Sequence, residues 1–554
     1  MRTNSKLSLP VATRIFAIDP LPRSCRNRFS QFSGLLCLTV LVAGLRCVAS
    51  AAQPGERKSE DKQTESTSEN KAEKPVPNEE SSVTHHTIAT GGEEIAYTAK
   101  AGNLLIRQGD DPVASMFYVA YTRDGVANLD HRPVTFFYNG GPGSSTIWLH
   151  MGSYGPRIVE TADAKPTGPA PYRLMNNPDS LLDKSDLVFI DAVSTGFSQI
   201  VGTGKGDDFY SVDGDVQAFA KFIRRYVTLN RRWNSPKFLF GESYGTPRSA
   251  ALVNELQHKG MYFNGVILLS SVLNYATLHT PGLDDAPVNM LPTYAAIAWF
   301  HKKLPHRPDN LDKFLQEVRD FASGEYAQAL ARGQSRTDEQ TGAVVKRLHE
   351  LTGLSESFLK ECNLRVSPAR FRKELLRDQG RTVGRLDGRF LGIDFDNAGD
   401  QPDSDPSSTA ILGAYSGAFN SYVTDKLNYR HDAPYQVRSS EIRRGIWNFE
   451  HKLPDFRRMQ QAYPLFYTVD DLAQAMRENP SLKVLSANGY FDLATPFYGA
   501  ERDLYQMELD RSLRGNLTFT YYQSGHMVYL NADVRKAFRA DLEKFYKTAA
   551  PREP

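Results

Sequence analysis

One serine in this chain lies in a local sequence that, between a strand and a helix, is typical of a nucleophile turn. Residues 241–245 read Gly-Glu-Ser-Tyr-Gly; they follow the apolar run 238–240 and precede a segment with helical character, residues 249–256. Glycines two positions on either side of a serine allow a strained strand-to-helix turn, which lifts the serine hydroxyl clear of a sheet edge. Such a pentapeptide can also be a simple flexible turn. The strand before it and the helix after it favour Ser243 as a nucleophile.

Two later segments supply partners for Ser243. A serine hydroxyl is a poor nucleophile unless a base takes its proton and a further group orients that base. Asp492 follows a predicted strand at residues 483–487, and His526 follows a predicted strand at residues 517–522. The interval between them leaves room for one crossover helix between parallel strands. Asp492 could instead cap a helix, and His526 could be an ordinary loop histidine. The order serine, acid, histidine after successive strands is nevertheless that of an α/β-hydrolase.

A glycine-rich loop precedes the serine motif. The predicted strand 135–138 runs into Asn-Gly-Gly-Pro-Gly at residues 139–143. Glycines allow backbone N–H groups to approach a developing oxyanion closely. The residue after the nucleophile, Tyr244, is predicted to supply one such N–H group. A tight turn alone would explain one or two of these glycines but not the whole run.

Taken together, these motifs resemble the serine carboxypeptidase family over residues 90–545. The resemblance is carried by the sequences at 139–143, 191–198, 241–245, 489–492 and 525–527, which occur in the family's order. It implies that Ser243 is the nucleophile, His526 the general base and then acid, and Asp492 the orienting carboxylate.

The same resemblance implies two binding elements. The backbone N–H groups of Gly141 and Tyr244 form the expected oxyanion hole. Asn139, Gly140 and Glu242 are expected to bind the terminal carboxylate of a peptide substrate.

The chain departs from the family at one position of this carboxylate clamp. A glutamate beside a substrate carboxylate requires that one of the two be protonated. In the family a second glutamate raises the pKa of the first, and its place falls here at Ser153. We therefore expect Glu242 to lose part of its upward pKa shift. The hypothesis is an activity optimum less acidic than is usual for the family, or a weaker preference for a free C-terminus.

The expected fold class is α/β, an α/β-hydrolase fold with a mostly parallel central sheet flanked by helices and a largely helical cap insertion. The predicted core comprises residues 89–275 and 430–548, and its first strands are expected to be antiparallel. The predicted cap is residues 276–429, where helical periodicity replaces the strand pattern.

The N-terminal segments predict export. In residues 1–51, arginines precede the apolar run 32–45, and Ala-Ser-Ala at 49–51 offers a cleavage site, as in a signal peptide. An uncleaved anchor is the alternative. Residues 52–88 are rich in Glu, Lys, Ser and Pro and predict a disordered linker. Cleavage would leave Cys362 as the only cysteine, so no internal disulfide is expected. Eukaryotic members of the family that the chain resembles are held by disulfides, so the resemblance implies a bacterial protein, periplasmic or secreted. No integral membrane span is expected after cleavage.

The composition limits the kinds of partner that the chain is expected to bind. With 66 Lys and Arg against 64 Asp and Glu, the net charge of +2 gives no global field for nucleic acid, and no nucleic-acid partner is expected. No His/Cys spacing suits a metal, and the glycine-rich loop lacks a phosphate-binding lysine, so no metal or cofactor is expected. The expected partners are peptide substrates, and the sequence does not predict an oligomeric state. Two alternatives stay open: an esterase or acyltransferase on the same scaffold, and a catalytically silent peptide-binding protein.

Overall fold

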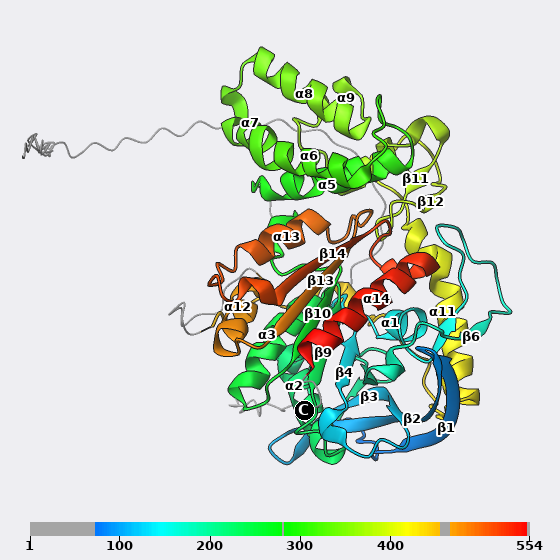
Figure 1. Ribbon diagram of the computed structural model, residues 1–554. Coiled ribbons are helices and arrows are strands. Elements are labelled where there is room, and N and C mark those ends of the chain that lie inside the picture. Colours follow the sequence, from blue (N-terminus) through cyan, green and yellow to red (C-terminus); the bar gives the residue numbers. More distant parts are fainter. Residues whose placement is uncertain (1–72, 280–281, 455–465, 551–554) are drawn as a thin grey trace, which may run out of the picture. The chain divides into compact units, whose positions relative to one another are not determined.

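A computed structural model of the chain describes residues 73–279, 282–454 and 466–550 (Figure 1). The predicted signal peptide and most of the predicted linker lie outside these residues. The described residues form a ten-stranded central sheet. Its strands are β1 (Ser81–Thr90), β2 (Glu93–Gln108), β3 (Asp111–Arg123), β4 (Val134–Tyr138), β7 (Asp186–Ile190), β8 (Gln199–Ile200), β9 (Lys237–Glu242), β10 (Gly265–Leu269), β13 (Lys483–Gly489) and β14 (Leu517–Tyr522).

The sheet has an antiparallel end and a parallel remainder. Its order is β1-β2-β3-β7-β4-β9-β10-β13-β14, with β8 paired to β3. Pairing is antiparallel from β1 to β7 and parallel from β7 to β14. Because parallel strands all end at the same edge, the loops after β4, β9, β13 and β14 meet there. This arrangement confirms the predicted α/β-hydrolase fold class.

Helices cover both faces of the sheet, and each face has its own apolar core. One core contains side chains of α2 (Val212–Leu229), α3 (Gly245–His258) and α12 (Val469–Glu478). The other contains side chains of α1 (Ile147–Gly152), α11 (Pro406–Asp425) and α14 (Ala532–Ala549). The strands between them are buried on both faces, as parallel strands in such a sheet require.

The linker predicted for residues 52–88 overlaps the first strand of the sheet. Its last residues form β1, which pairs with β2 over the register from Ser81–Gly102 to Thr90–Glu93. Most of β1 carries polar side chains, and alternate positions along it are exposed. The low apolar content of this segment predicted disorder, but it is also typical of an edge strand. Backbone hydrogen bonds to β2 give β1 its ordered structure.

A block of helices follows β10. It comprises α4 (Ala276–His279), α5 (Asp285–Phe300), α6 (Leu311–Phe321), α7 (Ala327–Arg332), α8 (Asp338–Thr352), α9 (Glu356–Glu361) and α10 (Pro368–Glu374). Helices α5 to α9 lie together beyond α13 (Phe497–Tyr505) in Figure 1. Their side chains form a third apolar cluster, which includes Phe491 and Phe497 beside the predicted catalytic acid. Helix α11 lies within the predicted cap range, yet it packs in the core on the sheet.

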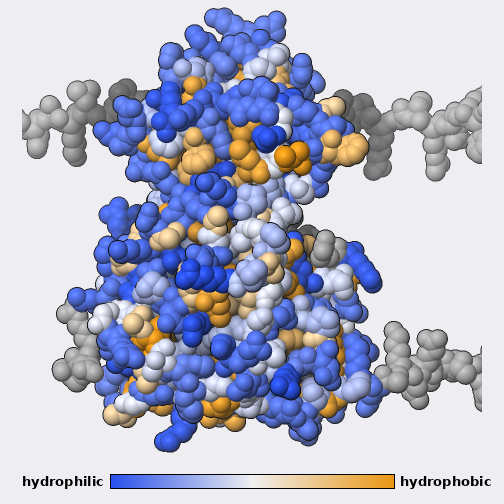
Figure 2. All heavy atoms as spheres, turned by 90° about the vertical axis from the view of Figure 1, so that its right-hand side faces the viewer, coloured by the Kyte–Doolittle hydropathy of each residue, from blue (hydrophilic) through white to orange (hydrophobic). Residues whose placement is uncertain are grey.

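Short strand pairs complete the described residues. Strand β5 (Arg157–Val159) pairs with β6 (Leu174–Asn176), and β11 (Thr382–Val383) pairs with β12 (Leu391–Gly392). On the face drawn in Figure 2, apolar side chains lie in small groups among hydrophilic ones. Within residues 73–279, 282–454 and 466–550, no helix combines the length and apolar character needed to cross a membrane.

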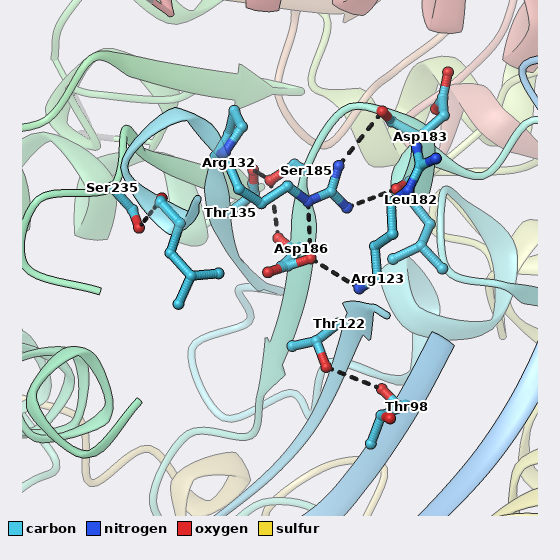
Figure 3. A network of polar contacts seen from close by, with 12 residues as sticks. Thr98, Thr122, Arg123, Arg132, Thr135, Leu182, Asp183, Ser185, Asp186 and Ser235 are labelled. Carbon is cyan, nitrogen blue, oxygen red and sulfur yellow. Dashed lines mark hydrogen bonds and ion pairs between the residues drawn. The ribbon is translucent and has the colours of Figure 1, made fainter. Parts of the chain in front are cut away.

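A buried ion-pair network ties the strands together at the edge opposite their carboxyl ends. Asp186, the first residue of β7, accepts hydrogen bonds from Arg132 Nε (3.0 Å) and from the backbone N–H of Arg123 (3.1 Å). Figure 3 shows the Arg132 side chain and the Arg123 backbone nitrogen directed at this carboxylate. Arg232, which precedes β9, donates to the other Asp186 oxygen. The network joins the starts of β4, β7 and β9.

Candidate active site

Ser243 lies on the turn between β9 and α3. Its backbone has φ of +61°, in the left-handed region that residues other than glycine rarely adopt. A Cβ atom on Gly241 would lie 2.1 Å from the carbonyl oxygen of Gly245, so only glycine fits at position 241. The Ser243 N–H donates to the carbonyl of Leu269 on the neighbouring strand (3.0 Å). The strained turn predicted for this motif is therefore present.

Asp492 and His526 form a buried pair. His526 Nδ1 lies 2.7 Å from Asp492 Oδ2, and the two residues are 4% and 0% exposed. The other carboxylate oxygen accepts the backbone N–H groups of Ala494 (2.8 Å) and Thr495 (3.1 Å). Burial lowers the pKa of His526, but the charge and hydrogen bond of Asp492 outweigh it, so the net pKa is raised. A histidine oriented in this way is a competent general base.

Backbone contacts join the histidine loop to the serine turn. Ser270, directly after β10, donates its hydroxyl to the carbonyl of His526 (2.6 Å). The preceding residue, Leu269, accepts the N–H of Ser243. Among the described residues the Ser243 hydroxyl has no hydrogen-bond partner, and Ser243 is partly exposed. Catalytic hydrogen bonds are often long before substrate binds, so this geometry is compatible with attack once a substrate is present.

The glycine-rich loop after β4 approaches the serine turn very closely. A Cβ atom on Gly140 would lie 2.2 Å from the backbone nitrogen of Tyr244, a distance that no side chain could occupy. Gly141 has φ of +115°. In the part of the chain that the structure describes, the N–H groups of Gly141 and Tyr244 donate no hydrogen bond. Both remain available for an oxyanion.

Asn139 and Glu242 are buried beside this loop. Glu242 is 2% exposed and accepts a hydrogen bond from the Tyr529 hydroxyl (2.8 Å). Burial raises the pKa of Glu242 to about 7, against the lowering effects of His526 and of hydrogen bonds from Tyr529 and Asn139. Asn139 Oδ1 accepts the backbone N–H of Leu149 (2.9 Å), which orients its amide.

Ser153 is hydrogen-bonded within its own helix turn. Its buried hydroxyl donates to the carbonyl of Leu149 in α1. We expected that replacement of the family's second glutamate by Ser153 would remove part of the pKa shift of Glu242. Burial is the largest cause of the shift that Glu242 has, and it raises the pKa to about 7 without a second glutamate. The expected loss of part of the shift stays a prediction.

Three further contributors were not predicted from the sequence. Thr495 donates its hydroxyl to Asp492, Tyr529 donates to Glu242, and Leu386 accepts the N–H of His526 (2.6 Å). Thr495 and Tyr529 each lie three residues after a predicted catalytic residue, so sequence proximity could have indicated them. Leu386 belongs to the distant β11–β12 hairpin, and its backbone contact leaves no signal in the sequence.

Comparison with known proteins shows which sequence family part of the chain is similar to. The model of the serine carboxypeptidase family matches residues 93–285. A serine carboxypeptidase-like 45 protein of Arabidopsis thaliana is 24% identical over 200 residues, which are 34% of this chain and 40% of the relative. The match thus spans less than half the length of that relative.

Solved structures that align with this chain include two peptidases. A prohormone-processing carboxypeptidase, Kex1(Δ)p of Saccharomyces cerevisiae, aligns with a TM-score of 0.49 and 16% identity over 81% of this chain and 91% of that chain. Proline iminopeptidase of Mycobacterium smegmatis aligns with a TM-score of 0.34 and 13% identity over 81% of this chain and 98% of that chain.

Proposed function

We propose that this chain, whose residues 93–285 match the model of the serine carboxypeptidase family, is a serine-type carboxypeptidase that releases C-terminal amino acids from peptides. The observation that carries the proposal is the buried carboxyl group of Glu242 directly before Ser243. With a pKa of about 7, this carboxyl is protonated in mildly acidic solution. It can then donate a hydrogen bond to a substrate carboxylate instead of repelling it.

The rest of the site supports peptide-bond cleavage next to that carboxylate. His526 Nε2 would take the proton from the Ser243 hydroxyl as its oxygen attacks the carbonyl carbon of the last peptide bond. The N–H groups of Gly141 and Tyr244 would stabilise the resulting oxyanion. Collapse of this intermediate breaks the C–N bond, and His526 returns the proton to the leaving amino group. Water, deprotonated by His526, then hydrolyses the acyl-enzyme.

Paired substrates test this function. N-blocked dipeptides and the corresponding C-terminal amides are incubated with wild type and with Ser243→Ala, and the products are identified by mass spectrometry. We expect wild type alone to release the C-terminal residue from the free acid and to spare the amide. Equal cleavage of acid and amide would show that Asn139 and Glu242 do not select a terminal carboxylate. Cleavage of small esters without cleavage of peptides would favour an esterase.

Export is a second part of the proposal. It rests on the charged, apolar and small-residue segments of residues 1–51, which match a signal peptide. An exported bacterial enzyme would begin after Ala51, and N-terminal sequencing of the protein isolated from its native cells tests this. A mature chain that retains residues 1–51 would contradict cleavage.

A further inference from the structure

One exposed arginine lies next to the catalytic histidine. Arg385 belongs to the loop between β11 and β12, which extends from the helical block to both catalytic loops. Its carbonyl accepts the N–H of Leu493, the residue after the catalytic acid (3.0 Å). The carbonyl of the next residue, Leu386, accepts the N–H of His526. The backbone of Arg385 is therefore bonded between the two loops that carry Asp492 and His526.

The loop that carries Arg385 is firmly held. Asp405 Oδ1 accepts the N–H of Arg385 (2.8 Å). Two residues on, Asp387 accepts the N–H of Gly525, next to His526 (3.2 Å). Asp387 is also paired with the buried guanidinium of Arg389 (2.7 Å). These contacts fix the distance from the Arg385 backbone to the catalytic histidine.

The guanidinium of Arg385 is exposed, and no ion pair among the described residues includes it. Its positive charge nevertheless acts on two residues at the site, His526 and Tyr275. Burial and the Arg385 charge both lower the pKa of His526, against the larger effect of Asp492. Burial raises the pKa of Tyr275, and the Arg385 charge is the largest effect that opposes this rise. The Tyr275 ring packs edge-on against that of Tyr244, which follows the nucleophile (6.4 Å between centroids).

The charge of Arg385, which has no ion-pair partner among the described residues, slightly disfavours the protonated form of His526. His526 must become positively charged when it takes the proton from Ser243, and a nearby arginine disfavours that charge. An anion bound to Arg385 would remove the penalty. A guanidinium binds a carboxylate in a planar, two-pronged geometry, which makes arginine well suited to recognise Asp or Glu.

We propose that Arg385 binds the acidic side chain of a substrate residue next to the scissile bond, so that the enzyme prefers peptides with Asp or Glu at the last or the penultimate position. This inference rests on the proposed carboxypeptidase function. It adds the chemical class of the preferred substrate.

Matched peptides test the preference. N-blocked dipeptides carry Glu or Gln, which have nearly the same shape, at the penultimate or at the C-terminal position. Values of kcat/KM are measured for wild type, Arg385→Gln and Arg385→Lys. Arg381→Gln is the control, because Arg381 is an exposed arginine of the same region whose side chain donates to the carbonyl of Gly380.

We expect wild type to prefer Glu over Gln about tenfold or more at one of the two positions, the effect of a charge-assisted hydrogen bond. Arg385→Gln should bring that ratio close to one while cleavage of the Gln peptides is retained. Arg385→Lys should retain part of the preference, and Arg381→Gln all of it.

Three results would overturn the inference. The first is a wild-type Glu/Gln ratio of one or less at both positions, and the second is an unchanged ratio in Arg385→Gln. The third is an equal loss of activity on the Glu and Gln peptides in Arg385→Gln, which would place Arg385 on the terminal carboxylate instead. Failure of wild type to cleave even the Gln peptides would contradict the proposed function itself, so the two failures are distinguishable.

Discussion

Thr495 donates its hydroxyl to the same oxygen of Asp492 that lies against His526. The Thr495 Oγ1 to Asp492 Oδ2 distance is 2.6 Å, and that oxygen is 2.7 Å from His526 Nδ1. The hydroxyl also lies 3.2 Å from His526 Nδ1. The Thr495 hydroxyl and the protonated histidine therefore donate to the same carboxylate oxygen. Because its negative charge is divided between two donors, the threonine limits how strongly Asp492 raises the pKa of His526.

Replacement of Thr495 by valine, which has nearly the same shape, should remove this hydrogen bond. Asp492 then attracts the imidazolium more strongly, the pKa of His526 rises, and less of the base is free at low pH. We expect kcat/KM at low pH to fall on the order of two- to tenfold, the net value of one hydrogen bond, and the acidic limb of the pH profile to move upward. Thr495→Ser keeps the hydroxyl and should keep the wild-type profile. An unchanged profile in Thr495→Val would show that the hydroxyl does not act on His526.

The raised pKa of Glu242 predicts an upper pH limit for the binding of peptides with a free C-terminal carboxylate. Its pKa is raised from 4.5 to about 7, chiefly by burial, so the group is protonated below that pH and anionic above it. KM for free-acid peptides should therefore increase as pH rises above about 7, because the anion repels the substrate carboxylate. Glu242→Gln cannot ionise and should lose this increase. A wild-type KM that stays constant from about pH 5 to 9 would contradict the role given to Glu242.

The same ionisation has a consequence for stability. The folded state retains the Glu242 proton up to about pH 7, whereas the unfolded state loses it near 4.5. The stability associated with this proton is thus fully present below pH 4.5 and is lost as the pH rises through about 7. Denaturant unfolding at several pH values should show that wild type loses stability relative to Glu242→Gln over this interval. A constant difference between the two proteins would contradict the raised pKa.

Gly140→Ala should damage the oxyanion hole. A methyl group at Gly140 would lie 2.2 Å from the Tyr244 nitrogen, so the glycine-rich loop and the serine turn must separate. We expect kcat to fall on the order of 10²–10³-fold, as for removal of an oxyanion donor. Gly168→Ala is the control, because a Cβ at Gly168 meets nothing within 4 Å. Equal activity of the two variants would argue against an oxyanion hole at Tyr244.

Asp186→Asn should destabilise the fold without changing the chemistry of the site. The substitution leaves the buried guanidinium groups of Arg132 and Arg232 without their anion, which costs about 3–5 kcal/mol of unfolding free energy. The exposed pair of Arg173 and Glu160 gives the control: Glu160→Gln should change that free energy by about 1 kcal/mol or less. Denaturant unfolding measures both. A loss from Asp186→Asn no larger than the control's would show that the network contributes little.

Much of the fold followed from local sequence patterns. Strong apolar runs before Asn139, Ser243, Asp492 and His526 predicted the parallel strands, and the structure places all four residues shortly after such strands. The glycine run at residues 139–143 predicted a close approach, which the 2.2 Å distance at Gly140 confirms. These features are local, so a single stretch of sequence carries them.

Features that depend on distant contacts could not be predicted in this way. Strand β1 is ordered by its pairing with β2, and its own residues are those of a linker. The pKa of Glu242 depends on burial by several elements of the fold, whereas the sequence indicated only the missing second glutamate at Ser153. The position of Arg385 beside His526 arises from a hairpin more than a hundred residues away in the sequence. Such relationships exist only in the folded chain.

The most direct test of the central claim is a mass-spectrometric time course on an N-blocked pentapeptide in H₂¹⁸O, with wild type and Ser243→Ala. The account predicts stepwise loss of single residues from the C-terminus by wild type only. Each shortened peptide should carry ¹⁸O in its new carboxylate, because water resolves an acyl-enzyme on Ser243. Internal cleavage, or C-terminal release that persists in Ser243→Ala, would contradict it.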